Sequence, residues 1–301
     1  MPDVIATNSE IARVGIQELI PVYDKRQNDY WRKTGFRRIK TTQEFERVYQ
    51  EGGFGQATEF GEGSNIPIQT LTNPYNLDIY WVSRGLGYSC SYNKIATDQY
   101  GVMDRVAPKM SYSMKATFEL VAADVFNQAT NTAAAYLGPD GQPLASASHP
   151  YLGGTMQNTQ SLDLSDTNME LALVDLLDQK DYRGLPMSCE GPFWLVTGNG
   201  NAGIANRMKL TSQVTETAEN DMSWAHTQLK GPIVNPFITD RDAWGLVSVN
   251  QDKHGLVMVQ LGGDTVETER YKHNKTVAFF RSAEFTFRHV DHRGVWWSPG
   301  A

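Results

Sequence analysis

Residues 114–129 read MKATFELVAADVFNQA, and they predict the longest helix of the chain. Apolar side chains recur here at intervals of four and three residues, which places them on one face of an α-helix. They are Met114, Phe118, Val121 and Val125. The alanines between them favour a helix by propensity. Because proline suits the first turn of a helix, Pro108 predicts a start near that residue, and the helix is expected to cover about 108–131. Gly138-Pro139-Asp140-Gly141 then predicts a turn.

The stretch before this helix predicts a long exposed excursion that returns along a strand. Residues 52–75 read GGFGQATEFGEGSNIPIQTLTNPY, in which glycine, serine, threonine and proline are dense. Leu77, Ile79 and Trp81 then follow at every second position, which is typical of a strand. Together these features predict a projecting hairpin. A hairpin of this length is not stable alone, so its apolar side chains need a surface on which to lie.

The N-terminal stretch is basic and carries aromatic side chains. Between Asp24 and Lys40 there are seven basic and two acidic residues, interleaved with Tyr30, Trp31 and Phe36. Basic and aromatic residues together can contact nucleic acid. The interpretation we favour is an extended arm whose aromatic side chains dock on a neighbouring surface, and nucleic-acid contact stays open as the alternative.

The second half of the chain predicts one more helix and then mostly strands. Thr167 and Glu170 fit a capping box, which predicts a helix that begins near Thr167. Its apolar face is expected to consist of Met169, Leu173, Leu176 and Leu177. Residues 193–196, 256–261, 276–280 and 285–288 predict strands. The order of arm, hairpin, long helix, mixed segment and strands indicates the α+β class.

Composition excludes several classes of protein. The 301 residues carry a net charge of -7, whereas a dedicated nucleic-acid reader usually has a basic domain. The N-terminus has no apolar run of a signal peptide, and no window is apolar enough for a membrane span, so we expect a soluble chain made in the cytosol with no membrane partner. Cys90 and Cys189 lack metal-ligand spacing and are expected to be buried small side chains in a reducing compartment.

The most distinctive local motif is a glycine pattern at residues 198–203. GNGNAG matches GxGxxG and follows the predicted strand at 193–196. In a Rossmann unit such glycines let the backbone approach a pyrophosphate, and Glu216 or Glu219 would fall near the ribose. The later sequence does not alternate strands with helices, so we expect an ordinary glycine-rich turn. A nucleotide-dependent enzyme that uses Gly198–Gly203 remains an alternative function.

The histidines predict no metal or catalytic site. His289 and Asp291 would point to one side of a strand and His292 to the other, which is poor geometry for a shared ion. His149 and His226 are isolated in the sequence and show no metal-ligand spacing. We therefore expect no catalytic residue, no metal and no cofactor.

Three short segments around the long helix carry a family resemblance. They are DQYG at residues 98–101, DGQ at 140–142 and HP at 149–150. In this order and spacing the chain resembles the major head subunits of tailed bacteriophages, particularly the Mu-type branch. The resemblance implies a structural subunit that catalyses nothing and encloses double-stranded DNA in an icosahedral shell.

The resemblance also implies the capsid fold of that family and its division into parts. Residues 1–50 would form the N-terminal arm and 51–92 the E-loop hairpin. Residues 93–160 and 256–301 would form the peripheral domain with its long spine helix, and 161–255 the axial domain. The candidate subunit-contact residues of the E-loop and arm are Phe54, Phe60, Glu62, Ile66, Ile68, Trp31, Phe36, Arg37 and Arg38.

The implied partners are many copies of the chain itself in pentamers and hexamers, a scaffolding protein, a portal and packaged DNA bound without sequence specificity. No long charged helical segment precedes the arm, which implies either a separate scaffolding protein, the alternative we favour, or a chain already in its mature form. No lysine lies between Gly52 and Trp81, so a lysine crosslink from this E-loop is not expected. The expected location is the virion, with assembly in the host cytoplasm.

Two further alternatives belong to the class of structural proteins. An encapsulin-like compartment would share the shell architecture and hold protein cargo in place of DNA. A tail-tube or decoration protein would usually lack the long central helix.

Overall fold

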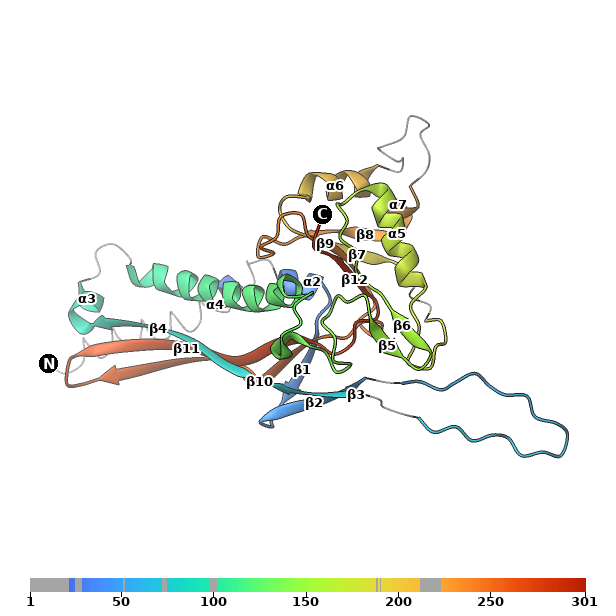
Figure 1. Cartoon of the computed structure of the whole chain (residues 1–301). Coiled ribbons are helices and arrows are strands. Elements are labelled where there is room, and N and C mark those ends of the chain that lie inside the picture. The colour runs from blue at the N-terminus through green and yellow to red at the C-terminus, as the bar shows by residue number, and fades with distance from the viewer. Residues whose placement is uncertain are drawn as a thin grey trace.

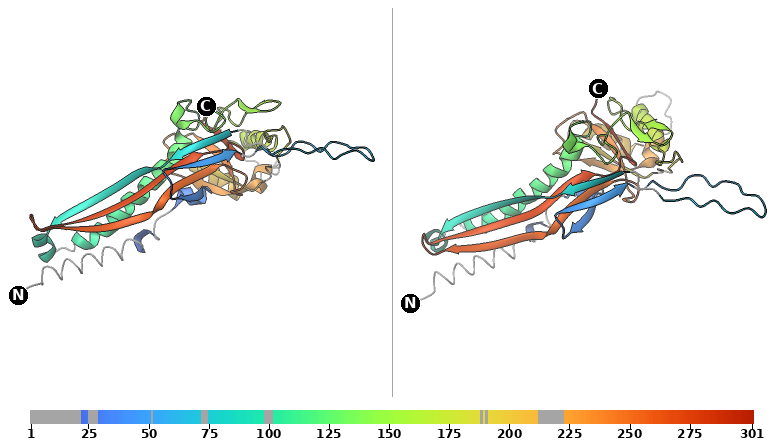
Figure 2. Two further views of the ribbon diagram at one scale, coloured as in Figure 1. Left: turned by 90° about the horizontal axis from the view of Figure 1, so that it is seen from below. Right: turned by 60° about the horizontal axis from the view of Figure 1, so that its bottom comes forward.

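A four-stranded sheet and one long helix form the elongated part of the molecule (Figure 1). The computed structural model describes residues 22–24, 29–50, 52–71, 75–97, 102–187, 189, 191–211 and 223–301. The strand order is β1 (Arg37–Thr41), β10 (Leu256–Tyr271), β11 (Thr276–His289) and β4 (Val82–Ser91). β1 runs parallel to β10, and the other pairs are antiparallel. Helix α4 (Val102–Asn127) lies along this sheet (Figure 2).

Helix α4 confirms the predicted long helix but begins earlier than Pro108 suggested. Pro108 lies inside the helix. Proline lacks an N–H, so it removes one backbone hydrogen bond, and that loss is offset here by packing. Val106, Ala107 and Met110 are buried with Val277 and Phe279 of β11, which holds the first turns of the helix on the sheet.

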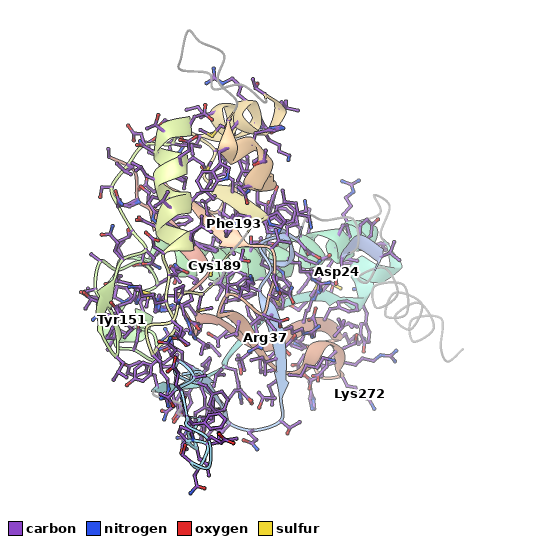
Figure 3. The ribbon with its side chains drawn as sticks, turned by 90° about the vertical axis from the view of Figure 1, so that its right-hand side faces the viewer. Asp24, Arg37, Tyr151, Cys189, Phe193 and Lys272 are labelled. Carbon is purple, nitrogen blue, oxygen red and sulfur yellow. The ribbon has the colours of Figure 1, made fainter. Side chains whose placement is uncertain are left out.

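A second four-stranded sheet forms the compact part. Its order is β12 (Val295–Ser298), β9 (Trp244–Ser248), β7 (Phe193–Thr197) and β8 (Leu229–Val234). Helices α5 (Asp166–Leu177), α6 (Ala202–Leu210) and α7 (Trp224–Gln228) pack against it. The core between them includes Phe193, labelled in Figure 3, and a Trp244–Trp296 ring pair at 4.8 Å.

Helix α5 has its N-cap two residues before the predicted one at Thr167. Ser165 is the N-cap, and its hydroxyl accepts a hydrogen bond from the backbone N–H of Asn168 at 3.2 Å. Thr167 therefore lies within the first turn and does not cap the helix. The capping-box prediction was wrong because Ser165 offers an equally good hydroxyl earlier in the chain.

The predicted projecting hairpin is confirmed. β2 (Phe45–Gln50) pairs with β3 (Tyr75–Tyr80), and residues 52–71 between them extend away from the body (Figures 1 and 2). We call residues 52–71 the projecting loop. Trp81 lies just outside β3, and β4, which follows, belongs to the long sheet because it pairs with β11 along its length.

The predicted C-terminal strands merge into longer ones. Residues 256–261 begin β10, and the segments 276–280 and 285–288 are parts of one strand, β11. β12, which follows β11 in the chain, belongs to the compact sheet. The smaller elements are α2 (Tyr30–Lys33), α3 (Tyr92–Ala96), the 3-10 turn η1 (Ala134–Tyr136), and the hairpin of β5 (His149–Tyr151) and β6 (Gly154–Met156). The expected α+β class is confirmed.

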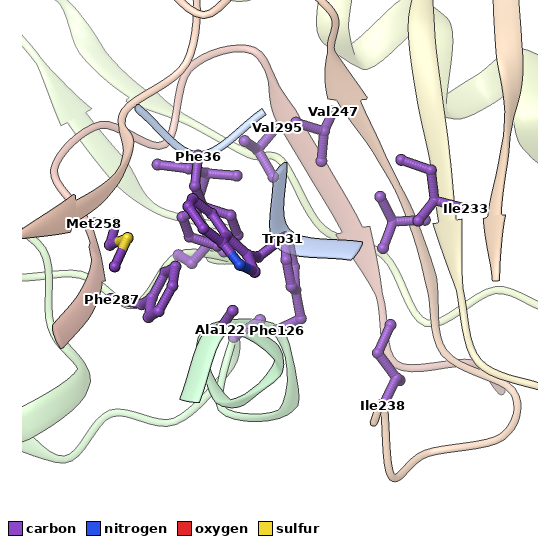
Figure 4. Close-up of a cluster of buried hydrophobic side chains, with 14 of the residues drawn as sticks. Trp31, Phe36, Ala122, Phe126, Ile233, Ile238, Val247, Met258, Phe287 and Val295 are labelled. Atoms are coloured by element: carbon purple, nitrogen blue, oxygen red, sulfur yellow. The ribbon is translucent and has the colours of Figure 1, made fainter. Parts of the chain in front are cut away.

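The core between the two sheets contains two side chains of the predicted arm (Figure 4). Trp31 is 7% exposed and Phe36 is 4% exposed. Their rings meet Phe287 edge-on at 5.4 Å and 5.2 Å, and Phe36 also meets Phe126 at 5.9 Å. The prediction that these two aromatic side chains dock on a neighbouring surface was wrong, because both are buried in the core of their own subunit.

Cys90 and Cys189 are both buried and are not joined in a disulfide, and their burial was expected. None of the helices in the described ranges is both long and apolar enough to span a bilayer.

Candidate subunit-contact surface

The projecting loop is held by few hydrogen bonds. The backbone N–H of Gly55 donates to the side-chain oxygen of Gln69 at 2.8 Å, and the side-chain nitrogen of Gln69 donates to the carbonyl of Gln56 at 3.1 Å. At the base, the guanidinium of Arg183 donates to the carbonyl of Thr70 at 2.9 Å. The Gln69 side chain thus links the outgoing and the returning segment of the loop.

Five large apolar side chains of the projecting loop are exposed. They are Phe54, Phe60, Ile66, Ile68 and Leu71, and Ile68 is 96% exposed. Several large exposed apolar side chains on one segment of a protein indicate an interaction site. Covering one such side chain stabilises a contact by about 1.5–3 kcal/mol. The predicted contact residues Phe54, Phe60, Glu62, Ile66 and Ile68 thus all lie on one exposed segment.

The base of the loop is firmer. Arg47 of β2 makes two hydrogen bonds, at 2.6 and 2.7 Å, to the carboxylate of Asp78 opposite it on β3. This guanidinium lowers the pKa of Asp78. Phe45 and Tyr80 form a further cross-strand ring pair at 5.6 Å. The hairpin base therefore fixes the direction in which the loop leaves the body.

Helix α5 has an exposed apolar stripe that sequence reasoning missed. Leu171, Val174 and Leu177 follow at three-residue intervals, and all three are exposed. Leu177 was expected on the buried face, which instead consists of Met169, Ala172, Leu173 and Leu176. The spacing of these three residues in the sequence could have predicted the stripe, since a second apolar face on a helix indicates a second partner.

The arm is anchored on α4 by a buried carboxylate. The two oxygens of Glu119 accept hydrogen bonds from the backbone N–H groups of Tyr30 at 2.8 Å and Trp31 at 3.1 Å. Lys115 of the same helix pairs with Asp29 at 2.6 Å. Burial raises the pKa of Glu119 to about 7, against the opposing effect of the two N–H groups.

We expect the contribution of Glu119 to stability to grow on mild acidification. A carboxyl group whose pKa is raised on folding stabilises the fold fully below its unfolded pKa, 4.5 here, and this contribution is lost as the pH rises through about 7. Urea unfolding of wild type and Glu119→Gln at about pH 5 and about pH 8 measures it. The stability difference, wild type minus variant, should be larger at the lower pH. A difference that grows toward alkaline pH would contradict the burial of this carboxyl.

Arg37 and Arg38, the two basic candidates, lie on strand β1 and are exposed. The guanidinium of Arg38 donates to the side-chain oxygen of Gln260 on β10. The other two contact candidates of the arm, Trp31 and Phe36, are buried. Because β1 is an edge strand of the long sheet, Arg37 and Arg38 are accessible to a partner there.

The glycine motif does link a strand to a helix. Gly198–Gly203 connects β7 to α6, and β8 then runs parallel to β7, so the chain makes the parallel crossover that its sequence did not suggest. The loop is nevertheless filled by the chain itself. A side-chain carbon on Gly198 would lie 2.6 Å from the carbonyl oxygen of Asp240. Asn201 also donates to the carbonyl of Asp242 at 2.9 Å.

The glycines therefore admit a close approach of the 240–242 backbone, which occupies the place that a pyrophosphate would need. Glu216 and Glu219, the candidate ribose ligands, lie outside the described residues, as does the DQYG segment. The geometry does not support the nucleotide-binding alternative.

This interpretation predicts a contrast between two glycines of the same motif. A side-chain carbon on Gly200 would overlap the backbone of Arg241, whereas one on Gly203 meets nothing within 4 Å. We expect Gly200→Ala to lose about 1–3 kcal/mol through this overlap. Gly203→Ala should be neutral or slightly stabilising, since alanine suits a helix better. Urea unfolding of both variants measures the contrast, and equal stability would contradict the close approach.

Three titratable side chains that are distant in sequence meet in the interior. Asp140 Oδ2 lies 2.7 Å from His149 Nδ1 and 3.4 Å from His292 Nδ1. The two imidazole rings stack at 3.6 Å with an angle of 7° between them. The expectation that His149 is isolated was wrong. Asp291, which was expected on the same side of a strand as His289, pairs with Arg293.

Comparison with known families gives one match by sequence. A family model described as phage capsid protein matches residues 77–298. No curated protein matches the sequence.

Solved structures show the same fold at low sequence identity. The capsid of a native GTA particle has a TM-score of 0.59 at 11% identity, with 91% of each chain covered. The capsid of cyanophage P-SCSP1u has a TM-score of 0.56 at 12% identity, covering 88% of this chain and 86% of that one. The holo-SrpI encapsulin complex from Synechococcus elongatus has a TM-score of 0.52 at 8% identity, covering 91% and 88%.

Proposed function

Because this chain belongs to the phage capsid protein family and is a structural subunit of a capsid shell, we propose that it builds the icosahedral head of a tailed phage around double-stranded DNA. The observation that carries this proposal is the projecting loop. It presents five exposed apolar side chains and makes few contacts with its own subunit. A shell supplies the surface that such a loop needs, since the next copy always lies beside it.

In the proposed assembly the projecting loop packs on the adjacent copy. Such a contact joins two different surfaces, and repeated contacts of this type close into rings. Pentamers and hexamers are the rings we propose. The stripe of Leu171, Val174 and Leu177 on α5 is a second proposed contact. Each contact can be weak, because closure of the shell makes later contacts effectively intramolecular.

Packaged DNA is a proposed partner of the arm. Arg32, Lys33, Arg37, Arg38 and Lys40 form an exposed basic group on α2 and β1. Phosphate contacts of this kind are independent of sequence and weaken with salt. The net charge of -7 over the whole chain suits a container that holds DNA without clamping it.

The narrower assignments rest on the resemblance. The DGQ and HP segments support the Mu-type branch. A separate scaffolding protein, a portal and assembly in the host cytoplasm before release of the virion are proposed on the same ground. The division into N-terminal arm, E-loop, peripheral and axial domains is supported by the two separate sheets, with β4 counted with the long sheet and β12 with the compact one.

An encapsulin-like compartment is the competing proposal, since an encapsulin shares the fold. The match of the phage capsid family model over residues 77–298 favours the phage head. The basic group on the arm also suits DNA better than protein cargo.

Negative-stain electron microscopy of the purified full chain, with and without its scaffolding protein, tests the proposal. Closed shells, tubes or free rings are expected. Nuclease-protected double-stranded DNA in particles from the native source would separate the phage head from a cargo compartment. A uniform monomer or dimer under every condition would contradict a shell subunit.

A further inference from the structure

We propose that Asp140, His149 and His292 form a buried site that binds one proton, held by His149 as an imidazolium between Asp140 and Asn158. The hydrogen bonds of this proton link the segment after α4 to the connection from β11 to β12. His149 is fully buried, and the other two side chains are nearly so.

The first step concerns the orientation of Asn158, which is also buried. Its side-chain nitrogen donates to the carbonyls of Leu144 at 2.8 Å and Val295 at 3.2 Å. Its side-chain oxygen accepts the backbone N–H of Ser146 at 2.9 Å. These three bonds fix which atom is oxygen, because a flipped amide would set its nitrogen against a donor.

The second step concerns the hydrogens on the ring of His149. Its Nε2 lies 3.1 Å from the oxygen of Asn158, so Nε2 carries a hydrogen. Its Nδ1 lies 2.7 Å from Asp140 Oδ2. Burial alone would raise the pKa of Asp140, but the hydrogen bonds from His149 and His292 hold it well below its usual range. The other oxygen of Asp140 accepts the backbone N–H of Gln142 at 3.2 Å, so both of its oxygens are acceptors and the carboxylate is ionised. The proton between Asp140 and His149 therefore lies on Nδ1, and both ring nitrogens of His149 are protonated.

The third step concerns His292, whose ring stacks on that of His149. Burial lowers the pKa of His292, which favours its neutral form. A neutral ring stacks well on a cation, whereas two stacked cations would repel each other. Its Nε2 has no hydrogen-bond partner among the described residues, as expected for a lone pair without a proton.

None of the other titratable neighbours among the described residues supplies a positive charge that could balance Asp140 in place of this proton. Asp291, 3.9 Å from His292, is neutralised by Arg293. Burial lowers the pKa of His289 on β11 to about 3, so this ring is neutral, and the cation of Arg288 acts in the same direction. Tyr75 of β3 also faces Asp140, and burial raises its pKa, so it stays neutral.

A metal ion fits these three side chains less well than a proton does. The ligand lone pairs of an imidazole lie in the plane of its ring. The two rings are almost parallel, so their lone pairs do not converge on one point. Both nitrogens of His149 are also already hydrogen-bonded.

The place of the site in the fold gives it a structural consequence. Asp140 belongs to the turn after η1, His149 to β5, and His292 to the connection from β11 to β12. Asn158 extends the link to β12, since its carbonyl accepts the N–H of Trp297 at 3.0 Å. The bound proton thus joins the segment after α4 to the crossing between the long and the compact sheet.

Long-range 1H–15N NMR of the full chain labelled at histidine tests the proposal. At about pH 8, where a free histidine is neutral, one histidine should show two protonated ring nitrogens. Its signal should disappear in His149→Gln and persist in His226→Gln, a control that lies on α7. In His292→Gln the signal should also persist, since His292 does not hold the proton.

Three results would overturn the proposal. The first is a wild-type spectrum without a doubly protonated histidine at about pH 8, which decides the question even if no variant folds. The second is survival of the signal in His149→Gln. The third is stoichiometric binding of Zn²⁺ that His149→Gln abolishes, which would replace the proton by a metal.

Discussion

A subunit from which residues 55–70 are deleted folds as wild type does and forms no closed shells. The deleted residues contribute no side chain to any of the four buried clusters, so the free energy of unfolding should change little. Shell formation should fail, because each lost contact removes about 1.5–3 kcal/mol per covered side chain and is repeated in every copy. Circular dichroism and urea unfolding measure the fold, and sedimentation with electron microscopy measures assembly.

A point variant sharpens this prediction. Ile68→Ser should lower the yield of shells at least about tenfold, since a loss near 1.4 kcal/mol per contact already has this effect on one equilibrium. Ser64→Ala is the matched control, because Ser64 lies at the tip of the same loop and buries no apolar area. Normal shells from the deletion variant would show that the projecting loop is not the assembly contact.

Phe285→Ala should destabilise the subunit by about 3–5 kcal/mol. Phe285 is fully buried in the core between the sheets. Its ring stacks on Phe118 of α4 at 3.9 Å and meets Phe287 edge-on at 6.0 Å. Removal of this ring leaves a cavity at the place where the long helix is held on the long sheet. Urea unfolding of the unassembled subunit measures the loss.

The same strand provides the control for this variant. Phe280 lies on β11 and is 38% exposed, so Phe280→Ala should cost much less than Phe285→Ala. Equal losses at the two positions would show that the α4–sheet packing does not dominate the stability of this part.

The sequence predicted those elements that depend on local patterns. The apolar spacing of Met114, Phe118 and Val125 predicts α4, because a helix buries one face whatever covers it. The glycine-rich stretch predicts the projecting loop, since glycine, proline and small polar residues dominate it and interrupt helices and strands. The start of α4 was misplaced because packing of Val106 and Met110 outweighs the local effect of Pro108.

Contacts between distant segments could not be predicted in this way. Trp31 and Phe36 were expected at a neighbour, but they meet Phe287, which lies at the other end of the chain. His149 and His292 meet only because the chain passes twice through the junction of the two sheets. Spacing along the sequence carries no information about such pairs.

The candidate contact surface was predicted in part for the same reason. Phe60 and Ile68 lie in a segment whose exposure follows from its local composition. The stripe on α5 was missed because a helix with two apolar faces shows weaker periodicity than one with a single face.

The central claim is that the projecting loop lies on the next copy of the chain. A cryo-electron microscopy reconstruction of the assembled particle tests it most directly. We predict that residues 52–71 lie across the neighbouring subunit, with Phe60 and Ile68 covered by it. A reconstruction in which this loop folds back on its own subunit, or extends into solvent with Ile68 uncovered, would contradict the claim.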